Sequence, residues 1–414
     1  MEKFIFSPIY IFLIGLLNSL IVPIIGELSG SFFLILLSIA GWINQIDKKD
    51  RIVRTSFKLF MALIAVQIVT DVFHDTLFID KLKGVAIVIN GMIFFFFFLV
   101  ICKKNIDLIK WFVLGTVISP FLFSSSILYE EGYSYSAEDV TYFKFVIVPL
   151  ITNLFAVMVL FTKRREIHKK LAIAMFSAGA LCIVLGARSG GFMMLAAGGI
   201  YYYLKRKRLT IRILKRRAIR IGIIAYLCYA AIYVPLVMSG SLNAGNSSQL
   251  QKSSNPYNPI ELLKFGRTDS LVPFYAFLDN PITGWGYLAM DPHHKYATLL
   301  FNLSDGENIE KAITHYDKIP GHSVLFYFAC AYGFMALIIV GRLYYRSARA
   351  TFYSLLCDDR YLLDRLLCLT TVTWHLLFSP MPHFKYLPAY FAFLIVSSTK
   401  ATKVIKAKYE TGKL

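Results

Sequence analysis

Apolar runs long enough to cross a lipid bilayer recur along this chain from one end to the other. About 20 residues of helix match the ~30 Å hydrocarbon core of a membrane. Hydrophobic residues make up 57% of the 414 residues, and charged residues only 17%, too few to cover a soluble domain of this size. Because the bilayer offers the backbone no water, such runs must be helical. The sequence therefore predicts an all-α, polytopic membrane protein.

We predict twelve transmembrane helices. Their approximate cores are 4–23, 31–45, 59–74, 84–102, 111–128, 145–162, 171–187, 190–204, 219–239, 321–341, 361–378 and 386–399. With the N-terminus inside, alternation places 33 of the 44 Lys and Arg residues on the inner side of the membrane. This excess follows the positive-inside rule and predicts that both termini are cytoplasmic.

The net charge of +19 follows from this distribution and needs no nucleic-acid partner. The run KRKRLTIRILKRR at 205–217 has the composition of an RNA-binding patch, but an inner loop lying on anionic lipid headgroups explains it better. The segment 240–320 contains six basic and eight acidic residues, so it is not a general polyanion site. We therefore expect membrane lipid as a partner, and no nucleic acid.

The chain divides into three parts. Residues 1–239 form helices one to nine, 240–320 form a large helical loop between helices nine and ten, and 321–414 form the last three helices and a cytoplasmic tail. On the predicted topology the loop is periplasmic. No internal repeat relates the two halves of the chain.

The loop has helix signals of its own. Asn258–Pro259 predicts a helix start, and Arg267 falls on the helix that follows. Pro273 is expected to kink or end this helix. Ser304 and Glu307 have the spacing of a capping box and predict a second short helix.

Three basic or titratable side chains fall at outer helix ends or in the loop. Arg188 lies in GARSGG between the seventh and eighth spans, Arg267 lies in the loop, and His322 follows Pro320–Gly321 where the tenth span begins. An interfacial arginine that reaches toward headgroups would explain Arg188 alone. Arginines, however, favour the other side of this protein, and an ionisable residue at such a turn is a candidate site. The glycines Gly284 and Gly286 could bring backbone close to a ligand.

Arg267 and His322 are weak candidates when each is taken alone, and the remaining basic or titratable residues on this side are weaker still. Arg267 alone could be a solvated helix residue, and His322 alone a structural histidine. His293, His294 and His315 are expected on the surface, whereas His383 and Lys385 are further candidates for substrate binding.

The three main candidates form a chemically coherent set. Two guanidinium groups can hold a diphosphate through paired hydrogen bonds, which an ammonium group does less well. An imidazole can accept a proton from an attacking hydroxyl group near neutral pH. The outer loops lack an Asp-x-Asp motif, so we expect no metal and no other cofactor.

These residues resemble the superfamily of O-antigen polymerases and O-antigen ligases, which are bacterial inner-membrane glycosyltransferases. The resemblance rests on GARSGGF, on FGRTDSLVPFYAFLDNPITGWGY, and on IPGHSVLFYFACAYGFMAL, in this order. In detail it covers residues 186–192 and 258–336; the first half of the chain matches only in its number of spans. A large periplasmic loop in the second half adds to the likeness.

The resemblance implies an undecaprenyl-diphosphate-linked oligosaccharide as substrate. An acceptor hydroxyl would attack the anomeric carbon with inversion and without metal, with Arg188 and Arg267 holding the diphosphate and His322 acting as the base or orienting the acceptor. Ligases of the family commonly have Asn after this histidine, whereas this chain has Ser323. The departure favours a polymerase over a ligase. The sugar, the linkage, the kind of surface glycan, the oligomeric state and any partner that sets chain length stay open.

A flippase for lipid-linked sugars is the alternative from another class. Transporters commonly carry charged residues at mid-membrane and discontinuous helices in two related halves. Here the acidic residues Asp71 and Asp364 lie near span ends, and a flippase has no need for a loop of about 80 residues on one side. We therefore favour the glycosyltransferase.

Overall fold

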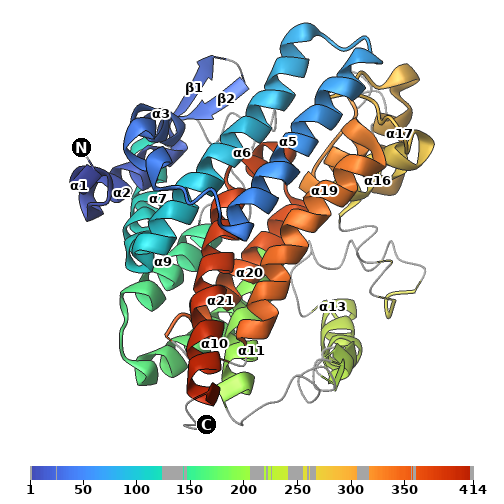
Figure 1. The fold of residues 1–414 in the computed structure, drawn as a ribbon. Helices are drawn as coiled ribbons and strands as arrows, with labels where there is room; N and C mark the ends of the chain where they lie inside the picture. Colours follow the sequence, from blue (N-terminus) through green and yellow to red (C-terminus); the bar gives the residue numbers. More distant parts are fainter. Residues whose placement is uncertain are drawn as a thin grey trace.

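The computed structural model describes residues 2–24, 26–123, 143, 147–205, 219–220, 222–224, 226–240, 255–258, 261, 267–304, 317–355, 357 and 360–410. The residues described are mostly helical (Figure 1), as the sequence predicted. Most of the predicted helix after Asn258–Pro259, together with Glu307 and His315, lies outside the described residues. The second predicted loop helix, which would begin after Ser304, also lies outside the described residues; the described part of the loop contains α17, which ends at Ser304.

The helices follow one another along the chain and are labelled in Figure 1. Their bounds are α1 Glu2–Ile5, α2 Pro8–Leu16, α3 Gly30–Leu37, α4 Ile39–Trp42, α5 Arg51–Val72, α6 Phe78–Lys104, α7 Ile109–Phe123, α9 Val148–Phe161, α10 Arg165–Val184, α11 Arg188–Lys205, α13 Val234–Met238, α16 Thr268–Asp279, α17 Lys295–Ser304, α19 Val324–Ser354, α20 Leu362–Phe378 and α21 Leu387–Glu410. The shorter elements are η1 Leu17–Ser19, η2 Ile43–Gln45, η3 Ile106–Leu108, η6 Tyr229–Tyr233, η7 Pro292–His294 and η8 Met381–Lys385, with strands β1 Ile21–Ile24 and β2 Gly26–Ser29.

Within the described ranges, five helices are long and apolar enough to cross a membrane. They are α5, α6, the stretch Ile106–Phe123, α10 and α19. Shorter apolar helices cover Pro8–Ser19, Val148–Phe161 and Gly222–Met238. The first predicted span, 4–23, is wrong at its end, because β1 and β2 form an antiparallel hairpin with Val22 opposite Leu28.

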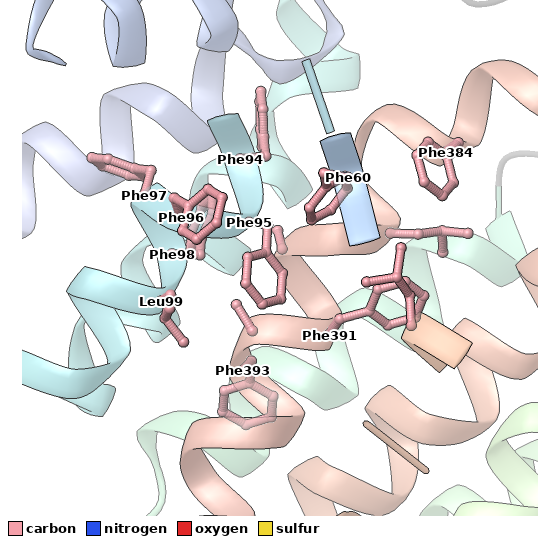
Figure 2. Packing of buried hydrophobic residues seen from close by; sticks show 14 of the residues in the cluster. Phe60, Phe94, Phe95, Phe96, Phe97, Phe98, Leu99, Phe384, Phe391 and Phe393 are labelled. Atoms are coloured by element: carbon pink, nitrogen blue, oxygen red, sulfur yellow. The ribbon is translucent and has the colours of Figure 1, made fainter. Parts of the chain in front are cut away.

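Helix α6 occupies the centre of the bundle. The five consecutive phenylalanines Phe94–Phe98 are all buried, as expected for a helix that is apolar on every face. Figure 2 shows them beside Phe60 of α5, Phe384 of η8, and Phe391 and Phe393 of α21. Most neighbouring rings meet edge to face or tilted, and Phe94 stacks with Phe98; both arrangements are ones that aromatic pairs prefer.

Basic side chains join several helices at one end of the bundle. Lys103 forms an ion pair with Asp50, and Arg360 forms one with Asp107. Lys400 Nζ donates to the carbonyls of Cys102 and Lys103 at 3.0 and 3.1 Å. Helices α6 and α19 end here, and α21 passes here ten residues before its own end, whereas α5 and α20 begin here. The start of α6, α19 and α21 and the end of α5 and α20 therefore lie toward the opposite end of the bundle.

Helix α19 is broken at Gly333. This residue has φ 71° and ψ −166°, a conformation reserved for glycine. The loop containing Gly284, Trp285 and Gly286 packs against the break. The amides of Trp285 and Gly286 donate to the carbonyls of Cys330 and Ala331 at 2.8 and 2.9 Å. In return, the amide of Phe334 donates to the carbonyl of Pro281 at 2.8 Å, so backbone groups freed by the break are satisfied.

The loop also ties α16 to α17. Asp279 accepts hydrogen bonds from Lys295 Nζ and from the hydroxyl of buried Tyr296, both at 2.7 Å. These two bonds, with the charge of Lys295, hold the pKa of Asp279 below its usual range. A carboxylate with a lowered pKa stabilises the fold above the unfolded pKa of about 4, and this contribution is lost as pH falls through the lower, folded value.

We therefore expect Asp279→Asn to loosen α16 and α17 at neutral pH. The variant should lose about 0.5–1 kcal/mol of local stability, because Asp279 and Lys295 are exposed but the Tyr296 hydroxyl is not. Hydrogen exchange of the amides in 268–304 measures this loss. The difference from the unmodified protein should shrink below about pH 4, and a difference that stays constant down to pH 3 would contradict the assignment.

Candidate functional site around the end of helix α20

Arg267 stands at the start of α16 and lies over two aromatic rings of α20. It is the residue before the first helical position, Thr268, and not within the helix as the sequence predicted. Its guanidinium carbon lies 4.6 Å from the ring centre of Trp374 and 5.4 Å from that of Phe378. At these distances the ring faces attract the cation and hold it near the end of α20.

Pro273 explains how His322 is attached to α16. The proline lies inside the helix and does not end it. A proline has no N–H, so it leaves the carbonyl four residues earlier, that of Asp269, without its helical donor. The amide of His322 donates to this carbonyl at 3.3 Å, and the hydroxyl of Ser270 donates to the carbonyl of His322 at 3.0 Å. Both backbone polar groups of His322 are therefore bound to the first turn of α16.

Ser323 fixes the other side of His322. Its hydroxyl oxygen accepts from the amide of Phe326 at 3.2 Å and caps the N-terminus of α19. The same hydroxyl donates to the carbonyl of Leu376 in α20 at 3.4 Å. The residue that departs from the ligase pattern thus has a local role, and it anchors His322 between α16 and α20.

Arg188 is the first residue of α11, which packs against the same end of α20. Phe192 contacts Trp374 with ring centres 6.5 Å apart, and the hydroxyl of Thr370 lies 3.4 Å from the carbonyl of Met193. The turn before α11 contains Gly186 at φ 90°, with open space where a side chain would be. Arg188 is therefore directed by a short turn to the region already occupied by Arg267.

The two arginines affect each other electrostatically. Burial lowers the pKa of the Arg267 guanidinium, the nearby charge of Asp269 raises it, and the charge of Arg188 lowers it further. Two like charges repel each other in a partly buried site, so the binding of an anion between them is favoured.

The structure thus brings Arg188, Arg267 and His322 to one end of α20. The two glycines that were predicted to bind substrate pack against other parts of the protein. Gly284 and Gly286 have φ 67° and 85°; a side chain at Gly284 would meet the backbone of α19 at 2.5 Å, and one at Gly286 would meet Thr76 and His74 beyond the end of α5. Their geometry is explained by packing, and substrate binding by these glycines stays a prediction.

The remaining predicted residues lie in η7 and η8. Lys385 is buried, with its ammonium group 5.1 Å from the ring centre of Tyr386, and the side chain of His383 lies outside the described part. Their roles stay predictions. His293 and His294 have positive φ values of 60° and 52° and fall in the turn before α17.

Sequence reasoning missed the aromatic pair Trp374 and Phe378. Within an apolar span, aromatic residues carry no signal that separates a functional ring from a core ring. The usable signal was their four-residue spacing next to Ser379–Pro380, which places both rings on one face at the end of the helix.

Comparison with known proteins leaves the chain unassigned: no family model matches it, and no curated protein matches it. The site itself has a definite chemistry. Two guanidinium groups can bind the oxygens of a phosphate or diphosphate, and the aromatic rings exclude water from one face of Arg267. The backbone of His322 lies on the adjacent loop, and an imidazole is a group that can exchange a proton near neutral pH.

Proposed function

We propose that this protein is a membrane glycosyltransferase that uses an oligosaccharide linked to undecaprenyl diphosphate. The convergence of Arg188, Arg267 and His322 at the end of α20 carries the proposal. Two guanidinium groups and one imidazole at a single helix end support the proposal, because this reaction needs groups that bind the diphosphate and a group that accepts a proton. The three motifs that resemble the O-antigen polymerase and ligase superfamily supply these same residues.

The proposed topology has twelve transmembrane helices in a bacterial inner membrane. Both termini and the basic end of the bundle would be cytoplasmic, and the α20 site periplasmic. The observation in favour of this arrangement is the separation of charge: the ion pairs of Lys103 and Arg360 lie at the other end of the bundle from the site.

In the proposed reaction, a hydroxyl oxygen of the acceptor attacks the anomeric carbon of the donor glycan. The bond between this carbon and the phosphate oxygen breaks, and its electron pair leaves with undecaprenyl diphosphate. The guanidinium groups of Arg188 and Arg267 stabilise the charge that develops on the leaving group. His322 takes the proton of the acceptor hydroxyl. Because the acceptor attacks the face opposite the leaving diphosphate in a single displacement, the configuration at the anomeric carbon inverts. The two guanidinium groups supply the positive charge that a metal would otherwise supply.

A polymerase, a ligase and a flippase can be separated by one experiment. The purified protein is placed in lipid vesicles with the lipid-linked oligosaccharide, in the presence of a metal chelator. A polymerase lengthens the lipid-linked glycan and releases undecaprenyl diphosphate. A ligase forms product only when lipid A–core is added, and a flippase forms no new bond. We expect lengthening without lipid A–core; no glycosyl transfer under either condition would reject the enzyme proposal.

Trp374 provides a separate prediction for this function. Trp374→Leu should raise KM for the lipid donor about tenfold, because a partly desolvated cation–aromatic contact contributes about 1–2 kcal/mol. Trp374→Phe should restore most of the loss, since it keeps an aromatic face under Arg267. Initial rates at varied donor concentration measure the effect. An equal loss in both variants, confined to kcat, would contradict a role in placing Arg267.

A further inference from the structure

Three buried side-chain oxygens near the end of α5 have no hydrogen-bond partner among the residues that the structure describes. They are Oδ1 of Asp71, Oε1 of Gln67 and the hydroxyl oxygen of Tyr332 in α19. Each of these residues is at most 5% exposed. Buried polar atoms are nearly always hydrogen-bonded or bound to an ion, so three such oxygens together need an explanation.

The three groups converge around Gly84 of α6. Asp71 follows Gln67 by four residues, so both lie on the face of α5 that packs against α6 and α19 (Figure 1). Gln67 Nε2 donates to the carbonyl of Gly84 at 3.4 Å, and a side chain at Gly84 would collide with the Tyr332 hydroxyl. Asp71 and Gln67 both lie near this hydroxyl. The missing side chain of Gly84 therefore lets polar groups from two other helices approach each other.

The hydrogen bond to Gly84 also fixes the orientation of the Gln67 amide. If the amide were turned over, Oε1 would face the carbonyl of Gly84 and two acceptors would meet. The nitrogen therefore faces Gly84, and Oε1 is left for a different partner. This partner must be a hydrogen-bond donor or a cation, as it must be for the carboxylate oxygen of Asp71.

The lysines at this end of the bundle bind other groups. Lys81 Nζ donates to two backbone carbonyls at the end of α5, at 2.6 and 2.7 Å. Lys83 and Lys318 both form ion pairs with Asp80, at 3.1 and 2.9 Å. In the described part of the chain, none of these lysines donates to Oδ1 of Asp71. A buried carboxylate without a counter-ion is unfavourable, so the cluster favours a positively charged ligand.

A monovalent metal cation satisfies all three oxygens at once. Hard cations prefer oxygen ligands such as carboxylates and amide carbonyls. A proton on Asp71 would satisfy at most two of the three oxygens, and a water molecule would leave the carboxylate without a counter-ion. A divalent ion would leave a net positive charge buried, because the cluster supplies only one carboxylate.

We propose that Asp71, Gln67 and Tyr332 bind a sodium ion between α5 and α19. Tyr332 directly precedes Gly333, where α19 is broken, and membrane proteins commonly bind sodium ions where a helix is interrupted. The ion joins α5 to the broken segment of α19 and so stabilises the packing around the break. It lies apart from the arginine site, takes no part in glycosyl transfer, and does not depend on the proposed function.

The test compares the melting temperature of the full-length protein in sodium chloride and in choline chloride, at equal ionic strength and about pH 8. We expect sodium to raise the melting temperature by about 2–4 °C, because an ion that binds only the folded state stabilises it. Binding of radioactive sodium to the same protein gives a second, direct measurement. Equal melting temperatures in the two salts, with no bound sodium, would overturn the proposal.

Asp71→Asn keeps the shape of the side chain and removes its charge, so it should abolish both the sodium shift and sodium binding. Tyr332→Phe, which removes one ligand oxygen, should raise the sodium concentration needed for half the shift about tenfold or more. Asp75→Asn is the matched control, because Asp75 is exposed just beyond α5, and it should keep the full shift. A sodium shift of the same size in Asp71→Asn and in the control would overturn the site.

Protonation of Asp71 is the alternative that the same measurements exclude or establish. If the carboxyl group is protonated, the melting temperature should rise between about pH 8 and pH 5 without any effect of sodium, and Asp71→Asn should remove this pH dependence. That result would overturn the sodium site. If Asp71→Asn does not fold, Tyr332→Phe decides between the two outcomes, because only the sodium site predicts a changed sodium dependence.

Discussion

Arg267→Ala is expected to reduce glycosyl transfer by about 10²- to 10³-fold while leaving the protein folded. Removing one group that stabilises developing negative charge typically has an effect of this size. Arg267 also lies against Trp374 and Phe378, so its loss removes a fixed donor and not a mobile one. Initial rates of undecaprenyl diphosphate release, at equal protein level in vesicles, measure the effect.

Arg267→Lys should recover little of this loss. An ammonium group is a compact point charge that cannot make paired hydrogen bonds to a diphosphate and stacks poorly on the two rings. Arg342→Ala is the matched control, because Arg342 is an exposed arginine on α19 outside the site. Full activity of Arg267→Ala, or an equal loss in Arg342→Ala, would reject the role of Arg267.

Gly333→Ala is expected to destabilise the protein by at least about 3 kcal/mol. The backbone conformation at Gly333 is strained for any residue with a Cβ, by about 1–3 kcal/mol. In addition, that Cβ would lie 2.1 Å from the carbonyl oxygen of Ile282, so the loop packed on the break must move. The yield of monodisperse protein and its melting temperature measure the loss.

Gly341→Ala, in the same helix, is the control. Gly341 has open space around its Cβ position and ordinary helical geometry. Alanine is favoured over glycine in a helix by about 1 kcal/mol, so this variant should be as stable as the unmodified protein or more so. If Gly333→Ala had the same melting temperature as the Gly341→Ala control, α19 would not be broken at this residue.

Much of the fold could be predicted from the sequence because hydrophobic length is a strong signal. Helices α5, α6, α10 and α19 each cover most of a predicted apolar core. The first span could not be placed, because a short apolar run such as Ile21–Ile24 suits a strand as well as a helix. The segment is a strand because it pairs with Gly26–Ser29, and this pairing cannot be inferred from a local hydrophobic pattern.

The two interruptions within helices have the same physical explanation. Gly333 breaks α19 because the loop 281–286 supplies backbone partners for the groups freed by the break. Pro273 stays inside α16 because His322 takes the carbonyl that proline leaves unpaired. In both cases the partner lies about 50 residues away, beyond any local rule for helix ends.

The candidate site was predicted in its charged residues and missed in its aromatic ones. Arg188 was selected because arginines are rare on the side to which it was assigned, and Arg267 because of its place in the large loop; their roles stay predictions. Trp374 and Phe378 could not be found, because their rings resemble the other aromatic residues of an apolar span. Only the position of Arg267 over them gives the pair a role.

An experimental structure with undecaprenyl diphosphate bound tests the central claim most directly. The account predicts the two phosphates between the guanidinium groups of Arg188 and Arg267, with the imidazole of His322 beside the leaving oxygen. Density for the diphosphate away from both arginines, or at the basic end near Lys103 and Arg360, would contradict it.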